Sequence, residues 1–473
     1  MNPAPPDDLP LPPDDLAFRR WLASRLKRDE ATYPGHPLYV PIHEGTSHDP
    51  VQRILRDIRL NESGKSLSFI SGFSGSGKST ELLRLKNQLV TEGFSAFIAD
   101  ADEYFVINKP VDGEVLLIKL AAAYCDALDR IADIDVSNQS YVERFWHWLT
   151  KTEVAMEGVE LNAGISAGDP KVAKAEFSSR VKLALKQNDS LQQKVKRARE
   201  EKPGAVLTDL RAFFAEITQA LRDIRPSMLS PVLILDTLEK VSDPFATTTE
   251  VFDSFVSLLT AQLEDLQIPG MHIVLTMPPW IKLRHLGLDH VRLLCAVKLW
   301  KNTPKRALYL DGYQRLRSVV RQRFTEAGLQ RFFGGANASG ERPIVDEIIA
   351  ASGGQLRDLI SLLYGTLLAA KDGPPAEGEP IATAEDVRSV IADHRSNYSR
   401  LSDEAVDCLA RIAKTRTCSF PNQEPKAILT LTSLFNSHHA FLLPNEEEWC
   451  DVHPLTLEAI KRKMKRSKPK ATS

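Results

Sequence analysis

The stretch SLSFISGFSGSGKSTELLRLKNQL, residues 66–89, decides how the rest of the chain is interpreted. It begins with a run of β-favouring residues, passes through a loop of glycines and serines, and ends in apolar residues at helical intervals. The stretch therefore predicts a strand over residues 66–71, a turn, and an amphipathic helix over residues 80–89.

The glycine-rich turn matches the spacing GxxxxGK[ST], whose residue types suit a bound phosphate chain. Glycines let backbone N–H groups turn inward around an anion, and the positive end of the following helix dipole faces the same anion. We expect Lys78 to reach the β- and γ-phosphates of ATP, the Ser79 hydroxyl to ligate Mg²⁺, and Thr80 to hold the α-phosphate side. The predicted nucleotide-binding residues are Gly72, Phe73, Ser74, Gly75, Ser76, Gly77, Lys78, Ser79 and Thr80.

Further strands are predicted downstream of this stretch. The runs PVLILD and HIVLTMP are apolar on both faces, which is typical of central parallel strands covered by helices. The predicted strands are therefore 66–71, 95–102, 231–236, 272–278 and 291–300. Residues 31–302 are therefore predicted to form a doubly wound α/β domain with a parallel sheet and a helical insertion over about 114–226.

The run PVLILD supplies the second half of the predicted site. Asp236 stands at the carboxyl end of its strand, where α/β sheets place ligands, and we expect it to complete the Mg²⁺ site with Ser79. Position 237 is a threonine, which is a poor base, so Glu239 is the candidate for orienting a water; a plain surface glutamate is the alternative. Thr276 ends the next strand, and it either positions water or is a simple strand-end residue.

The remaining chain is predicted to be mostly helical. Residues 303–400 are interpreted as a helical lid, and residues 401–460 as a small α+β domain with a β-hairpin over 439–454. The tail 461–473 is basic, which fits either DNA phosphate contacts or a solvated end. At the other end, residues 1–30 are expected to hold a disordered tail rich in proline and aspartate, followed by a short helix.

Composition excludes several classes of protein. The formal net charge of −2 gives no global attraction to nucleic acid or to a membrane, so any such binding needs a local patch. The five cysteines are scattered without CxxC spacing, so we expect neither a zinc site nor a disulfide framework. No basic and apolar leader opens the sequence, and the longest apolar stretch, 115–124, is too short to span a membrane. We therefore expect a cytoplasmic protein.

Four segments together resemble the P-loop ATPases of the AAA+/STAND type: GFSGSGKSTELLRL, PVLILDTLEK, HIVLTMP and SGGQLRDLI. The resemblance implies an α/β nucleotide domain, a helical lid and a winged-helix-like domain. It also implies that Asp236 is the Walker B aspartate, that Thr276 lies at the sensor-1 position, and that Arg357 approaches the γ-phosphate from the lid. No arginine stands out as a finger.

The resemblance implies an ATP-dependent conformational switch that acts on a protein partner or on self-association, in a setting such as bacterial signalling or defence. Hydrolysis is expected to be slow, because Thr237 stands where many active relatives carry a glutamate. The alternative is a DNA-associated ATPase of the origin-binding or transposition-helper kind, which the basic tail favours. A small-molecule kinase is a third reading, and the long insertion and C-terminal part argue against it.

Overall fold

The chain folds into two compact units. The computed structural model describes residues 10–27, 31–46, 49–106, 109–131, 140–152, 154, 170–187, 190–241, 249–279, 281, 291–303, 306–373, 375–376, 378–417, 425–443 and 449–467. The sheet unit comprises residues 50–71 and 82–292, and the lid unit comprises residues 1–49, 72–81 and 293–473. Residues 31–49 and 72–81, which the strand and helix pattern assigned to the α/β domain, fall in the lid unit.

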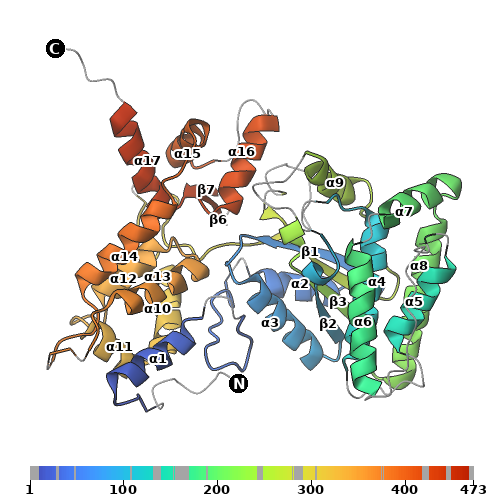
Figure 1. The fold of residues 1–473 in the computed structure, drawn as a ribbon, viewed down its shortest axis with the longest axis horizontal. Helices are drawn as coiled ribbons and strands as arrows, with labels where there is room; N and C mark the ends of the chain where they lie inside the picture. Colours follow the sequence, from blue (N-terminus) through green and yellow to red (C-terminus); the bar gives the residue numbers. More distant parts are fainter. Residues whose placement is uncertain are drawn as a thin grey trace. The chain divides into compact units, whose positions relative to one another are not determined.

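A five-stranded sheet is built in the order β2-β3-β4-β1-β5. Figure 1 labels three of its strands, β1, β2 and β3. The β1–β4, β2–β3 and β3–β4 pairs are parallel, as predicted from the apolar runs. The strands are β1 Ser66–Gly72, β2 Ser95–Asp100, β3 Pro231–Asp236, β4 His272–Met277 and β5 Val291–Leu294. β5 is shorter than the predicted run 291–300, and the other four strands lie where the sequence predicts them.

Successive strand residues point to opposite faces of the sheet, and these strands are apolar on both faces. Helices therefore cover both faces. On one face Ile70, Ile234 and Val274 pack with α2 Pro50–Arg59 and the later turns of α3 Lys78–Thr91. On the other face the Phe97 ring lies 5.5 Å from the ring of Tyr124. Tyr124 belongs to α4 Gly113–Asp129, so the sheet is doubly wound as predicted.

The insertion after β2 is helical, as expected. Its described helices after α4 are α5 Tyr141–Lys151, α6 Pro170–Gln187, α7 Ser190–Glu201 and α8 Ala205–Ile224, and α9 Thr249–Thr260 follows β3. α6 is highly charged, yet it is anchored from one side: the Ser178 hydroxyl donates to Asp126 of α4, and Lys182 Nζ lies 2.9 Å from the same carboxylate.

The lid has a helical core of its own. Its helices are α1 Asp15–Arg25, α10 Leu310–Phe324, α11 Glu326–Phe333, α12 Pro343–Ala351, α13 Leu356–Ala369 and α14 Ala384–Asn397. Phe18 from α1, Phe324 from α10 and Leu359 from α13 are fully buried in one cluster. Helices α10 to α14 thus make up most of the described part of residues 303–400.

Residues 10–14 are more ordered than their composition suggests. Residues 10–14 lead into α1, and Arg331 donates to the carbonyls of Pro12 at 2.6 Å and Pro13 at 3.1 Å. Arg25 at the other end of α1 donates to the Arg323 carbonyl at 2.6 Å. The segment is rich in proline and aspartate, and disorder was expected because it has few apolar residues to bury. Hydrogen bonds from arginines to its backbone carbonyls hold it instead.

The C-terminal module is a small α+β domain of the winged-helix-like kind predicted. It contains α15 Asp403–Thr415, α16 Pro425–Asn436, the antiparallel hairpin β6 Ala440–Leu443 and β7 Trp449–Val452, and α17 Pro454–Ser467. Cys450 of the hairpin is disulfide-bonded, which the scattered cysteine spacing did not predict. Among the described residues, no helix combines the length and apolar character needed to cross a membrane.

Candidate phosphate-binding site

The predicted phosphate loop joins β1 to α3, as the sequence indicates. Its backbone needs glycine at three places. Gly75 and Gly77 have φ values of 76° and 96°, which L side chains rarely adopt. A Cβ on Gly72 would lie 2.5 Å from the Leu294 carbonyl oxygen, a clash with backbone that cannot move aside cheaply. Glycine is therefore required at the positions where the GxxxxGK[ST] spacing places it and at Gly75 between them.

The Lys78 side chain is hydrogen-bonded to the loop that precedes it. Its Nζ donates to the carbonyl oxygens of Gly72 at 2.8 Å and Phe73 at 3.0 Å, and the residue is only 6% exposed. Ser79 and Thr80 follow in the first turn of α3, so their positions relative to Lys78 are set by the helix. A phosphate in the loop would meet the ammonium group and the helix N-terminus together, and the residues present fit such a group.

The lid places Arg357 directly on the loop. Arg357 Nη1 donates to the Ser74 hydroxyl at 2.7 Å, and its backbone N–H donates to the Gly75 carbonyl at 3.3 Å. A Cβ on Gly75 would lie 2.5 Å from the Arg357 Cβ, so the contact needs a glycine in the loop. Arg357 is in the first turn of α13, and the residue predicted as a lid arginine is therefore beside the phosphate loop.

The turn before α13 fixes that approach. Gly354 has φ 88°, and a Cβ there would lie 1.9 Å from the Val297 carbonyl oxygen. The Gly354 carbonyl accepts from the Val297 N–H at 3.0 Å. Gln355 next to it is fully buried, and neither polar atom of its side chain has a hydrogen-bond partner among the described residues. The buried amide of Gln355, two residues before Arg357, offers its NH₂ group as donor and its oxygen as acceptor to a polar ligand.

The C-terminal module also contacts the loop, which the sequence did not predict. Phe73, the second residue of the loop, is 1% exposed. Its ring stacks on Phe435 of α16 with centroids 5.6 Å apart, and it meets Phe441 of β6 edge-on at 6.2 Å. Sequence reasoning assigned Phe73 to the nucleotide, whereas the structure places its side chain against the C-terminal module. No local pattern in the sequence pairs residues so far apart.

A buried polar network continues from Arg357 into the module. Asp358 accepts from the Tyr398 hydroxyl at 3.0 Å and lies 3.3 Å from Nε2 of His453, a fully buried residue. Burial alone would raise the pKa of Asp358, but the hydrogen bond and charge of His453 bring it below its usual range. The pKa of the nearby His438 is lowered to about 4, mainly by burial; Asp358 opposes this shift, and Arg357 and Lys78 contribute to it.

In the sheet unit, the turn after β3 gathers the predicted carboxylate and hydroxyl groups. Asp236 is 9% exposed and accepts from the Thr237 N–H at 2.7 Å. The Leu238 N–H donates to the hydroxyl oxygen of Thr276 at 2.8 Å, which ties this turn to β4. Glu239 lies in the short 3₁₀ helix η3 Leu238–Val241 that follows. Asp236, Thr276 and Glu239 are thus on neighbouring strands and one turn.

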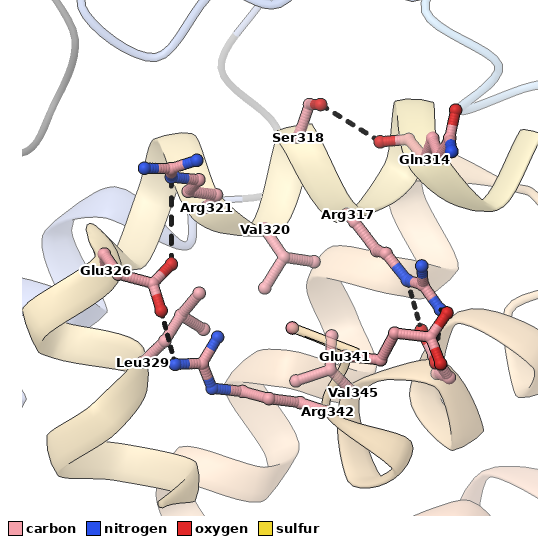
Figure 2. Close-up of a pocket in the computed structure, with 12 residues that line it drawn as sticks. Gln314, Arg317, Ser318, Val320, Arg321, Glu326, Leu329, Glu341, Arg342 and Val345 are labelled. Atoms are coloured by element: carbon pink, nitrogen blue, oxygen red, sulfur yellow. Dashed lines mark hydrogen bonds and ion pairs between the residues drawn. The ribbon is translucent and has the colours of Figure 1, made fainter. Parts of the chain in front are cut away.

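A separate hollow lies within the lid, between α10, α11 and α12 (Figure 2). Its volume is about 280 Å³, and three arginines line it. Arg317 forms a fork with Asp346 at 2.7 and 2.6 Å, while Arg342 pairs with Glu326. Because carboxylates already occupy these guanidinium groups, we assign no anion to this hollow.

Comparisons with known proteins add a general likeness. No family model matches the chain, and no curated protein sequence matches it. Among solved structures, the Aeropyrum pernix ORC2 protein is similar in its ADPNP–ADP form, with 12% identity and TM-score 0.39 over 93% of this chain and 98% of that one. Its ADP form has 14% identity and TM-score 0.39 over 94% and 98% of the two chains. The ORC1 protein of the same organism, in complex with DNA, has 10% identity and TM-score 0.36 over 93% and 96%.

With TM-scores below 0.5 and identities of 10–14%, these likenesses carry no argument about activity. The fold follows from the strands and helices of the chain itself. The functional assignment rests on the loop, the residues that surround it, and the carboxyl ends of the strands.

Proposed function

We propose that the chain binds ATP with Mg²⁺ through residues 72–80 and acts as a slow ATP-dependent conformational switch. The observation that carries the proposal is that the phosphate loop packs against both the lid and the C-terminal module, through Arg357 and through Phe73. A ligand in the loop therefore acts on contacts made by two other parts of the lid unit.

The charges around the loop suit a polyphosphate. Lys78 and Arg357 both contact the loop. The planar guanidinium group of Arg357 can donate hydrogen bonds to the γ-phosphate of ATP, which ADP lacks. Ser79, and Asp236 at the carboxyl end of β3, supply oxygen ligands of the kind that Mg²⁺ prefers. The ion would neutralise negative charge on the phosphates.

Switching follows from differential affinity. A ligand shifts an equilibrium only as far as it binds one state better than the other. In the state described, Arg357 is bonded to Ser74 and Gly75, and Phe73 is held by two rings. A nucleotide that recruits Arg357 or moves Phe73 changes how the lid and the C-terminal module are held. The surface released would serve a protein partner or self-association.

Slow turnover is part of the proposal because Thr237 follows Asp236. Thr276 and Glu239 are proposed to position water, and Arg357 to stabilise the charge of the γ-phosphate. Thr276 already accepts a hydrogen bond from Leu238, so its own proton is free to be donated elsewhere.

Replacing Lys78 tests nucleotide binding directly. Lys78→Ala is expected to weaken ATP binding by roughly 100-fold, because a charge-assisted contact to phosphate contributes about 1.5–3 kcal/mol. Calorimetric titration with a non-hydrolysable ATP analogue and Mg²⁺ measures the effect. Lys86→Ala, two turns further along α3, is the matched control and should bind as the wild type does. Wild-type affinity in the Lys78 variant would refute the assignment of the loop.

A DNA-associated ATPase is the second candidate, and one observation favours it. α17 extends from Pro454 into the basic segment KRKMKRS, and Lys461 is exposed on it. A basic helix at the end of a winged-helix-like module offers phosphate contacts that the net charge of the chain does not.

A further inference from the structure

The amide of Gln355 is buried without hydrogen bonds. The residue is fully buried, and neither the oxygen nor the nitrogen of its side chain has a partner among the described residues. Buried amides in native structures are nearly always hydrogen-bonded, because an unpaired one has lost its bonds to water and gained nothing. Such a group is expected where a ligand or an internal water completes its hydrogen bonds.

The turn that contains Gln355 does not use this amide. Gln355 directly precedes α13, yet its side chain makes no capping hydrogen bond to the helix. Ser352 closes the turn instead, because its hydroxyl donates to the Ile349 carbonyl at 2.7 Å and accepts from the Gly354 N–H at 3.2 Å. The Gln355 N–H donates to the Ser352 carbonyl at 3.1 Å. The turn is thus held by its backbone and by a serine, and the amide is left for another partner.

The two residues after Gln355 contact the phosphate loop. Leu356 Cδ1 lies 3.3 Å from the position that a Cβ on Gly77 would take, and Arg357 donates to the Ser74 hydroxyl at 2.7 Å. All of these residues belong to the lid unit. Leu356 also packs against the apolar cluster of the lid. An unpaired amide and an apolar side chain therefore stand together beside the loop, and this combination orients flat ligand groups in binding sites.

We propose that Gln355 is the base-recognition residue of the nucleotide site and that its amide pairs with the 6-amino group and a neighbouring ring nitrogen of adenine; this inference rests on the proposed function. The amide oxygen accepts from the 6-amino group, and the amide NH₂ donates to the ring nitrogen. The base thereby supplies the two hydrogen bonds that the described residues do not. Gln355 selects the base, whereas Lys78 and Arg357 act on the phosphates.

The chemistry of the amide favours adenine over guanine. Adenine shows a donor beside an acceptor on both edges that flank its 6-amino group, since it has ring nitrogens at positions 1 and 7. Guanine shows two acceptors on the edge that holds the nitrogen at position 7, which would leave the amide oxygen unpaired. Glutamine side chains read adenine in this bidentate way in protein–DNA contacts.

Burial of the amide also determines what a base must do to reach it. Gln355 has no exposed surface in the state described, so its side chain or its turn moves when a base binds. That movement breaks no hydrogen bond of the amide, and it converts an unpaired group into a paired one. The free energy recovered in this way favours adenine nucleotides over nucleotides whose base lacks the matching groups.

Gln355→Met tests the inference with a side chain of similar length that has neither an N–H nor an oxygen. The probes are ADP and purine riboside 5′-diphosphate, which lacks the 6-amino group, and neither has a γ-phosphate to hydrolyse. In calorimetric titrations with Mg²⁺ we expect the wild type to bind ADP roughly 10- to 100-fold more tightly than the analogue. Gln355→Met should bind the two equally. Gln330→Met, at an exposed position of α11, is the matched control and should retain the difference.

The stability of the variant supplies a second measurement. Methionine removes two unpaired polar atoms, so the thermal midpoint of nucleotide-free Gln355→Met should equal or exceed that of the wild type. A clear fall would mean that the amide is bonded in the ligand-free chain, for example to an internal water, and would overturn the inference. Equal binding of ADP and the analogue by the wild type, or an undiminished difference in Gln355→Met, would overturn it and leave nucleotide binding intact. A wild-type chain that binds no ADP would overturn both proposals.

Discussion

His438 is a neutral imidazole at neutral pH because burial lowers its pKa to about 4. Asp358 opposes this effect, while His453, Arg357 and Lys78 add to it. The residue has φ 62° in the turn before β6, so its side chain is presented by a strained position. A histidine that must stay neutral in the folded chain makes the stability of the lid unit sensitive to acid.

We expect the free energy of unfolding to fall between pH 7 and pH 5. The unfolded state, with a histidine pKa near 6.5, takes up protons in this range that the folded state does not, so stability is lost as the pH falls. His438→Gln should remove about 2 kcal/mol of the difference between the two pH values. Urea unfolding at pH 7 and pH 5 measures it, with the exposed His147→Gln as control. An unchanged pH difference in His438→Gln would contradict the burial argument.

At the scale of elements, the phosphate loop is short and most of its neighbours come from distant segments. α13 approaches it with Arg357, and α16 and β6 hold Phe73 between two rings. Gly353 has φ 62°, and a Cβ there would lie 2.8 Å from the Phe441 ring, so the turn before α13 also fits closely to the hairpin. The lid and the C-terminal module therefore share their packing with the loop.

Phe435→Ala is expected to loosen this arrangement. Removing a buried phenyl ring costs about 3–5 kcal/mol of packing, enough to release the C-terminal module from Phe73 locally. Hydrogen exchange over residues 72–81 and 425–443 should speed up in this variant. In the wild type, exchange over residues 425–443 should quicken when ATP is added. Tyr364→Ala, at an exposed position of α13, is the control. Unchanged exchange in the loop would show that the aromatic contact does not hold it.

At the scale of the whole molecule, DNA binding and self-association separate the two proposed functions. If the basic C-terminal segment binds duplex DNA, its affinity for DNA should be measurable near 50 mM salt and much weaker at about 200 mM salt, because phosphate contacts release counterions. Deleting residues 461–473 should weaken DNA binding. Fluorescence anisotropy with and without ATP, beside a mass measurement of the same samples, distinguishes a DNA-bound ATPase from an assembling switch. No binding at low salt would remove the DNA candidate.

Much of the architecture could be predicted from local patterns. The strand predicted over 231–236 is β3 with the same bounds, because a run that is apolar on both faces has few other stable environments. The glycines of the loop were predictable because GxxxxGK[ST] encodes a backbone shape. β5 is shorter than its apolar run, and residues 10–14 are bonded to the lid despite their composition. The roles of Asp236, Glu239, Thr276 and Arg357 stay predictions, as does a setting in signalling or defence.

The sequence by itself determined the order of strands and helices, the phosphate loop and the carboxylate at the end of β3, because these depend on neighbouring residues and on periodicity. Only the tertiary structure brought Phe73 against Phe435 and Phe441, Arg357 onto Ser74, and Thr237 onto Asp100. Such contacts join residues more than a hundred positions apart, and they depend on how the helices and strands pack. The sequence thus predicted a phosphate loop, and the packing decided which parts of the chain contact that loop.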